Sequence, residues 1–65
     1  MKELKLHNWY NISGLAHINK YDDYRYMGYG DNRYVFLTEN GHEVLLSIEQ
    51  MKKAIISSVI FKVLI

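Results

Sequence analysis

Sixty-five residues make one domain, 1–65, near the lower size limit at which a chain buries enough surface to fold alone. The chain has no cysteine, which excludes disulfide bonds and a cysteine-bound structural metal and favours a reducing, cytoplasmic compartment. Its net charge of +1, from eight Lys and Arg against seven Asp and Glu, is far from the basic balance of duplex-binding domains. The apolar run 54–65 is interrupted by Ser57, Ser58 and Lys62, and a membrane span needs roughly 20 apolar residues, so no membrane association is expected.

The first third of the chain predicts two strands. Residues 4–10 and 15–20 alternate loosely between apolar and polar side chains, which is typical of strands with one buried face. Asn11-Ile12-Ser13-Gly14 lies between them and has turn chemistry, because Gly14 can take a positive φ. The polar residues 21–23 then lead into a further strand.

The middle of the chain predicts two tight hairpins. Strand-like runs cover residues 24–29, 33–38 and 42–46. They are separated by Asp31-Asn32 and by Asn40-Gly41, which favour two-residue turns with positive φ at both central positions.

Two-residue turns fix which residues are opposed across the strands, and opposed residues lie on the same side of a sheet. The expected pairs are Tyr29 with Tyr34, Met27 with Phe36, Tyr26 with Leu37, Leu37 with Val44 and Phe36 with Leu45. One face is then the expected core and collects Tyr26, Gly28, Val35, Leu37, Val44 and Leu46. The other face is mixed and collects Arg25, Met27, Tyr29, Tyr34, Phe36, Thr38, Glu43 and Leu45.

The last third of the chain predicts one helix. Ser47 and Gln50 form a capping box, and apolar residues at helical spacing extend the helix over 48–63. Its second half is apolar all round, which predicts burial against a second copy of the chain. The expected contact residues of this homo-oligomer, a dimer or larger, are Ile56, Ile60, Phe61 and Leu64. The predicted fold is α+β: an antiparallel four- or five-stranded β-meander followed by one C-terminal helix, homo-oligomeric.

No motif predicts catalysis. His7, His17 and His42 lack the spacing of metal ligands, and the serines have local explanations as turn, cap and helix residues. Gly28-Tyr29-Gly30 is not followed by a helix, so it is not a phosphate-binding loop. No metal, cofactor or catalytic residue is therefore predicted, and a binding module is favoured over an enzyme.

Tyrosines are dense between residues 21 and 34, with Arg25 and Arg33 among them. Tyrosine is a good strand former and a favoured residue at protein interfaces, so structural and binding interpretations both remain open. In the binding interpretation, bases of single-stranded nucleic acid stack on the rings while cationic side chains meet phosphates. The expected site residues are Lys20, Arg25, Tyr29, Arg33, Tyr34 and Phe36. The alternative function is a small protein inhibitor that acts on a host-defence component through protein–protein contacts at the same surface.

The last strand and the start of the helix resemble a known family. Gly41, Val44, Leu46, Glu49, Gln50, Met51 and the apolar Ala54-Ile55 are similar to the glycine turn, short strand and helix start of the positive-cofactor type of transcriptional coactivator and its bacterial and phage relatives. The resemblance implies a strand meander followed by one helix, dimerisation through the helices, and binding of single-stranded or unwound DNA on the sheet. In size and simplicity the chain also resembles some anti-CRISPR proteins of phages and mobile elements.

Overall fold

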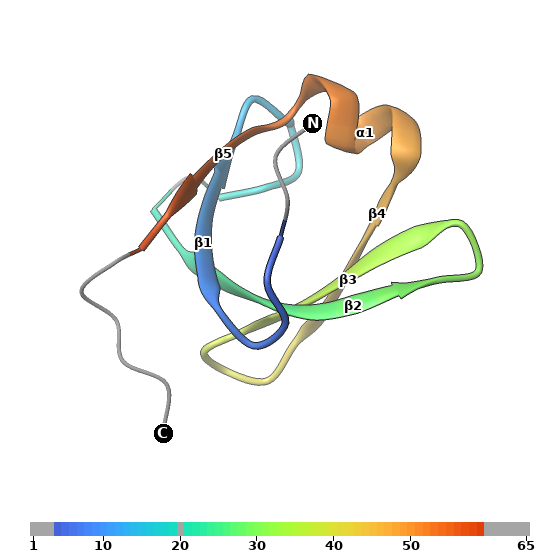
Figure 1. Ribbon diagram of the computed structural model, residues 1–65. Helices are drawn as coiled ribbons and strands as arrows, with labels where there is room; N and C mark the ends of the chain where they lie inside the picture. Colours follow the sequence, from blue (N-terminus) through green and yellow to red (C-terminus); the bar gives the residue numbers. More distant parts are fainter. Residues whose placement is uncertain (1–3, 20, 60–65) are drawn as a thin grey trace.

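A five-stranded antiparallel sheet and one short helix make up the fold. The computed structural model describes residues 4–19 and 21–59. Its elements in chain order are β1 (Trp9–Ser13), β2 (Asp23–Gly30), β3 (Arg33–Thr38), β4 (Glu43–Ser47), α1 (Ile48–Lys53) and β5 (Ile55–Ser58) (Figure 1). The predicted α+β class is therefore confirmed.

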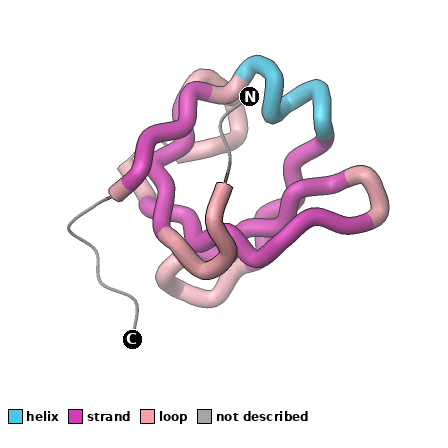
Figure 2. The backbone as a smooth tube through the Cα atoms, viewed as in Figure 1, coloured by secondary structure: helices cyan, strands magenta, loops and turns pink. Residues whose placement is uncertain are grey.

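The strands are ordered β4-β3-β2-β1-β5 in the sheet. β1 to β4 follow one another as a meander, but α1 then carries the chain from the β4 edge across to the far edge, where β5 pairs with β1. Figure 2 shows the strands curling round a common centre, with α1 along one rim. The sheet is thus a partly closed barrel, and the predicted order of a meander followed by a C-terminal helix is wrong at its last element.

The helix begins where the sequence predicts and ends much earlier. The Ser47 Oγ accepts a hydrogen bond from the Gln50 N–H at 3.1 Å, and the Gln50 Oε1 accepts one from the Ser47 N–H at 2.8 Å, so the capping box is present. α1 ends at Lys53, and Ala54 has extended backbone angles. In β5, Ile56 packs against the core while Ile55 is 64% exposed; this alternation of period two is that of a strand. The prediction of helix for 54–59 is therefore wrong, and 60–65 lie outside the described residues.

The first strand is displaced from its predicted position. β1 covers residues 9–13 instead of 4–10 because Tyr10 and Ile12 both point into the core. Residues 15–19, predicted as a strand, belong to the connection between β1 and β2. Gly14 takes a positive φ of 89°, as expected of a turn residue, but the three residues before it lie within β1.

The first hairpin forms the predicted turn and then departs from the predicted register. Asp31 and Asn32 both have positive φ, and Tyr29 pairs with Tyr34 as expected. A β-bulge follows between Tyr26 and Gly28, so that Tyr26 rather than Met27 pairs with Phe36. The extra residue in β2 places Tyr26 and Tyr29, three positions apart, on the same side of the sheet.

The second hairpin has a longer loop than its Asn-Gly dipeptide predicts. The Thr38 N–H donates to the His42 carbonyl at 2.9 Å, and the Gly41 N–H donates to the Thr38 carbonyl at 3.0 Å. Residues 39–41 therefore form a three-residue loop with Gly41 at a φ of 83°, the second common hairpin type. Leu37 consequently pairs with Glu43 instead of Val44.

This one-residue shift exchanges the two faces of β3 relative to the prediction. The core consists of Tyr10, Ile12, Tyr24, Tyr26, Phe36, Leu46 and Met51, with Tyr34 and Val44 packed against it. Val35 and Leu37, expected in the core, alternate with Phe36 and lie on the outer face. Phe36, expected on a binding face, is 0% exposed.

Candidate functional site

Three of the six residues predicted to bind nucleic acid meet at the tip of the β2–β3 hairpin. Tyr29 is near the end of β2, and Arg33 and Tyr34 open β3. The two-residue turn holds these ends together, so that Gly30 pairs with Arg33 and Tyr29 with Tyr34. These three residues, Tyr29, Arg33 and Tyr34, are called the hairpin surface below.

A series of aromatic rings connects the hairpin surface to the core. The ring centroids of Tyr29 and Tyr34 are 4.7 Å apart with an interplanar angle of 59°. Tyr34 is 6.3 Å from Tyr26, which is 5.4 Å from the buried ring of Phe36. Tilted pairs at these separations are favourable arrangements for aromatic rings. The buried end of the series holds the exposed end in place.

Tyr29 is the accessible ring of this series, at 50% exposure. Its hydroxyl donates to the Asn32 Oδ1 within the turn at 3.5 Å, which is longer than the usual O–H···O distance and makes this a weak hydrogen bond. The contact with Tyr34 is therefore the main restraint on the orientation of the ring. The sequence identifies Asn32 as a turn residue but does not predict its contact with the Tyr29 hydroxyl.

Arg33 supplies positive charge at the rim of the hairpin surface. Its side chain is exposed, and it stands opposite Gly30, which has no side chain. Alternation along β3 places the Arg33 side chain on the other side of the sheet from Tyr34. A ligand that stacks on Tyr29 therefore reaches Arg33 only by passing over the hairpin tip.

Two of the other predicted binding residues, Phe36 and Arg25, do not join this surface. Phe36 is fully buried, so its assignment to an exposed stacking platform is wrong; the loop shift in the second hairpin and the bulge in the first turn it into the core. Arg25 pairs with Leu37 nearer the opposite end of β2, and its Nε donates to the His7 carbonyl at 3.2 Å. Lys20 lies outside the described residues.

Only one of the four predicted oligomer contacts lies among the described residues. Ile56 pairs with Ile12 in the sheet and packs against the core, while Ile60, Phe61 and Leu64 lie outside the described residues. Because residues 55–58 form a strand, the prediction of self-association from a long helix that is apolar on every side has no support in this segment.

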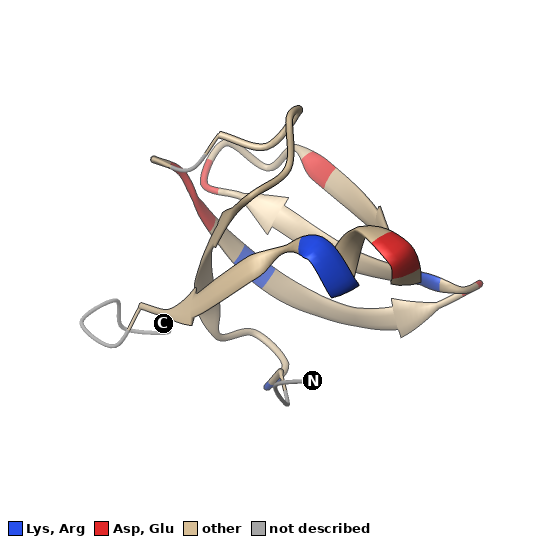
Figure 3. Cartoon of the chain, turned by 90° about the horizontal axis from the view of Figure 1, so that it is seen from above, with Lys and Arg blue, Asp and Glu red and all other residues tan. Residues whose placement is uncertain are grey.

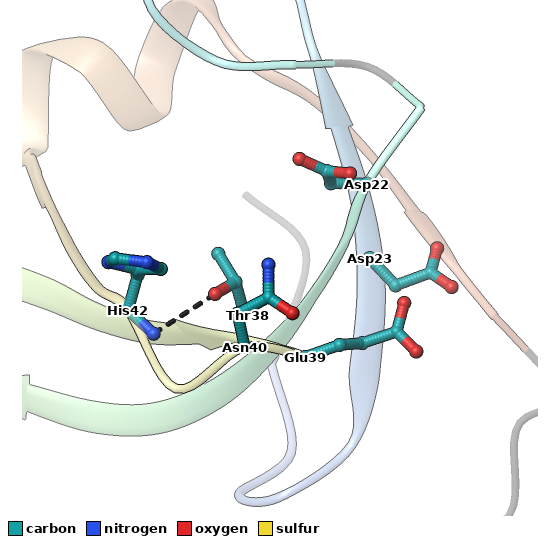
Figure 4. Close-up of a pocket in the computed structure, with 6 residues that line it drawn as sticks. All are labelled: Asp22, Asp23, Thr38, Glu39, Asn40 and His42. Carbon is teal, nitrogen blue, oxygen red and sulfur yellow. Dashed lines mark hydrogen bonds between the residues drawn. The ribbon is translucent and has the colours of Figure 1, made fainter.

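A cleft of about 390 Å³ lies at the opposite end of the β2–β3 hairpin from the aromatic surface. Figure 4 shows its lining, which consists of Asp22, Asp23, Thr38, Glu39, Asn40 and His42. The His42 N–H donates to the Thr38 Oγ1 at 3.0 Å. Three of the lining side chains are carboxylic acids, so this end of the hairpin disfavours a polyanion. Within residues 4–19 and 21–59, no three His, Cys, Asp or Glu side chains are grouped to hold a metal ion.

The basic residues of the described elements are spread over α1, β2 and β3. The basic segments of α1, β2 and β3 lie apart from one another (Figure 3). The phenol of Tyr26 lies beneath the hairpin surface, and its pKa is raised by burial and, to a lesser degree, by Tyr34 and Tyr10. The Tyr26 phenol beneath the hairpin surface is therefore uncharged at neutral pH.

Comparisons with protein-family models, with curated proteins and with solved structures gave no match. None of the helices in the described part of the chain has the length and apolar character needed to cross a membrane.

Proposed function

We propose that this chain is a non-catalytic module that binds single-stranded or unwound nucleic acid at the hairpin surface, in a cytoplasmic setting. The observation that carries the proposal is the half-exposed ring of Tyr29, held against Tyr34 at 4.7 Å. A base stacked on an aromatic side chain contributes roughly 1–3 kcal/mol, with little dependence on its identity.

The Tyr29 ring is held in position by its neighbours, and this favours binding for an entropic reason. A ring already restricted by Tyr34 and Asn32 loses less rotational freedom when a base stacks on it, and such preorganisation increases affinity. Tyr34 is half-buried and lies on the core, so it acts mainly as the support for Tyr29.

Charge contributes only modestly in this proposal. Arg33 is the cation of the hairpin surface, and the carboxylates of the acidic cleft lie at the far end of the same hairpin. A bound strand would therefore cross the tip, with a base on Tyr29 and a phosphate near Arg33. Since about one phosphate is neutralised, the logarithm of affinity should fall with the logarithm of salt with a slope of roughly −0.7.

Fluorescence anisotropy with labelled DNA and RNA oligonucleotides of mixed sequence tests the proposal. Tyr29→Ala should weaken binding by about 5- to 150-fold, the equivalent of one stacked base. Tyr21→Ala is the matched control, because Tyr21 is 83% exposed and lies in the β1–β2 connection. Equal affinities of the two variants for both nucleic acids, or no binding by the unmodified chain, would reject the proposal.

The second candidate is a small phage-type inhibitor that binds a host-defence protein through the same surface. The specific observation in its favour is the composition of the hairpin tip, where Asp31 lies beside Arg33 and Tyr34. Tyrosine and arginine are enriched in the residues that dominate protein–protein affinity, and a mixed-charge tip suits a protein better than a polyanion. Capture of a single protein that persists after nuclease treatment and is lost in Tyr29→Ala would favour this function.

A further inference from the structure

The outer face of strands β2, β3 and β4 carries an apolar strip that the hairpin surface does not use. Val35 and Leu37 alternate with the buried Phe36 in β3, and Leu45 alternates with the buried Leu46 in β4. Val35 pairs with Leu45 across the two strands, so the side chains are adjacent on one face. In an antiparallel sheet with one buried side, the opposite side is normally polar.

Leu6 extends this strip over β2. A Cβ atom added to Gly28 would lie 3.5 Å from the Leu6 Cδ2, which places the leucine over the bare backbone of the bulge. Gly28 pairs with Val35, so Leu6 adjoins the centre of the strip. Leu6 is 58% exposed and Leu45 is 40% exposed, which means that a substantial apolar area faces solvent. The outer strip is defined here as Leu6, Val35, Leu37 and Leu45.

Opposite charges stand on the two sides of the outer strip. Leu37 pairs with Arg25 of β2 on one side and with Glu43 of β4 on the other. Opposed residues share a face, so Arg25, Leu37 and Glu43 form one row across the three strands. Neighbouring strands are about 4.8 Å apart, which puts the backbone positions of Arg25 and Glu43 roughly 10 Å from each other.

This row is complementary to itself. A two-fold axis that runs parallel to β3, midway between two facing sheets, exchanges the β2 side with the β4 side. It places Arg25 of each copy opposite Glu43 of its partner and Leu37 opposite Leu37. Two sheets pack face to face at about 10 Å, and a two-fold interface uses the same patch on both subunits.

We propose that the outer strip is the interface through which two copies of this chain pair face to face, with two reciprocal contacts between Arg25 and Glu43. The bond from the Arg25 Nε to the His7 carbonyl holds the guanidinium in place, and its terminal amino groups are the donors for the facing carboxylate. A domain this small gains the buried apolar area that it otherwise lacks. The interface lies on the opposite side of the sheet from the rings of Tyr29 and Tyr34, while Arg33 shares the face of the outer strip at the hairpin tip.

Charge reversal tests the pairing by light scattering and sedimentation velocity. The unmodified chain should sediment as a dimer, and Arg25→Glu and Glu43→Arg should each raise the dissociation constant of the dimer by about a hundredfold or more, because each creates two like-charge contacts. An equimolar mixture of the two variants should dimerise again, since both contacts of the mixed dimer join opposite charges. The double variant R25E/E43R should also dimerise by itself.

Glu49→Arg is the control, because Glu49 is exposed on α1, away from the outer strip; it should leave the dimer intact. Circular dichroism of each variant establishes that it is folded, and recovery in the mixture is a result that an unfolded variant cannot give. A monomeric unmodified chain at high micromolar concentration, a dimer that survives either single reversal, or a mixture that stays monomeric would overturn the proposal.

Discussion

Replacing Gly28 with alanine is the sharpest test of the bulge in β2. Gly28 has a φ of 123°, a conformation that residues with a side chain rarely adopt. Space is not the obstacle, since the added Cβ would lie at an ordinary contact distance of 3.5 Å from the Leu6 Cδ2. The strain costs roughly 1–3 kcal/mol, and the reduced freedom of the unfolded alanine chain offsets about 0.4–1 kcal/mol of it.

The expected net loss in the free energy of unfolding is therefore about 1–2 kcal/mol. In a domain of this size, each kcal/mol lowers the melting temperature by about 4–8 °C, so Gly28→Ala should melt about 4–16 °C below the unmodified chain. Thermal and urea unfolding followed by circular dichroism measure the difference. If the outer strip also loses its shape, the dimer should weaken in parallel.

Gly30→Ala is the matched control in the same strand. No atom lies within 4 Å of a Cβ added at Gly30, and its φ is outside the positive range. It should be neutral or slightly stabilising, by up to about 1 kcal/mol. If both variants melted at the same temperature, the bulge would not depend on a positive φ at Gly28, and the register argument built on it would be refuted.

Three further predictions concern the buried ring of Phe36, the helix cap at Ser47 and the buried phenol of Tyr26. Phe36→Ala should lower the free energy of unfolding by about 3–5 kcal/mol, enough to leave much of the chain unfolded at 25 °C by circular dichroism. Ile55→Ala, at a position of β5 that is 64% exposed, should cost far less; similar losses would contradict the burial of Phe36. Ser47→Ala should cost about 1 kcal/mol in urea unfolding, and a neutral result would mean that the capping box does not stabilise the fold. Because burial raises the pKa of Tyr26 above its ordinary value of 10.0, its contribution to stability is complete below about pH 10 and is lost as pH rises through the raised pKa. Tyr26→Phe should therefore melt with a smaller alkaline decline, and an unchanged decline would contradict that assignment.

The parts of the fold that depend on local chemistry could be predicted from the sequence. The Ser47 cap and the Asp31-Asn32 turn each depend on side chains within a few positions, and both are present. The pair of Tyr29 and Tyr34 follows from the turn alone, so the centre of the hairpin surface was predictable.

Features that depend on register or on distant partners could not be predicted in the same way. The position of Phe36 depends on a bulge on one side and an extra loop residue on the other, and each moves a side chain to the opposite face. The apolar run after Lys53 fits both a helix and a strand, and periodicity cannot separate the two over so few residues. Residues 55–58 form a strand because they pair with the open edge of β1, which lies more than 40 residues earlier in the chain.

The pairing of β5 with β1 means that the sheet is complete only when the last strand has joined the first. The Val59 N–H donates to the Trp9 carbonyl at 3.1 Å, so almost the whole chain separates the two partners. Until residues 55–58 have docked, the flank of β1 that β5 occupies stays uncovered. Pairing of such distant segments is slow, and unpaired strand edges promote aggregation. A chain shortened before residue 55 would therefore lack its last strand and expose that flank of β1.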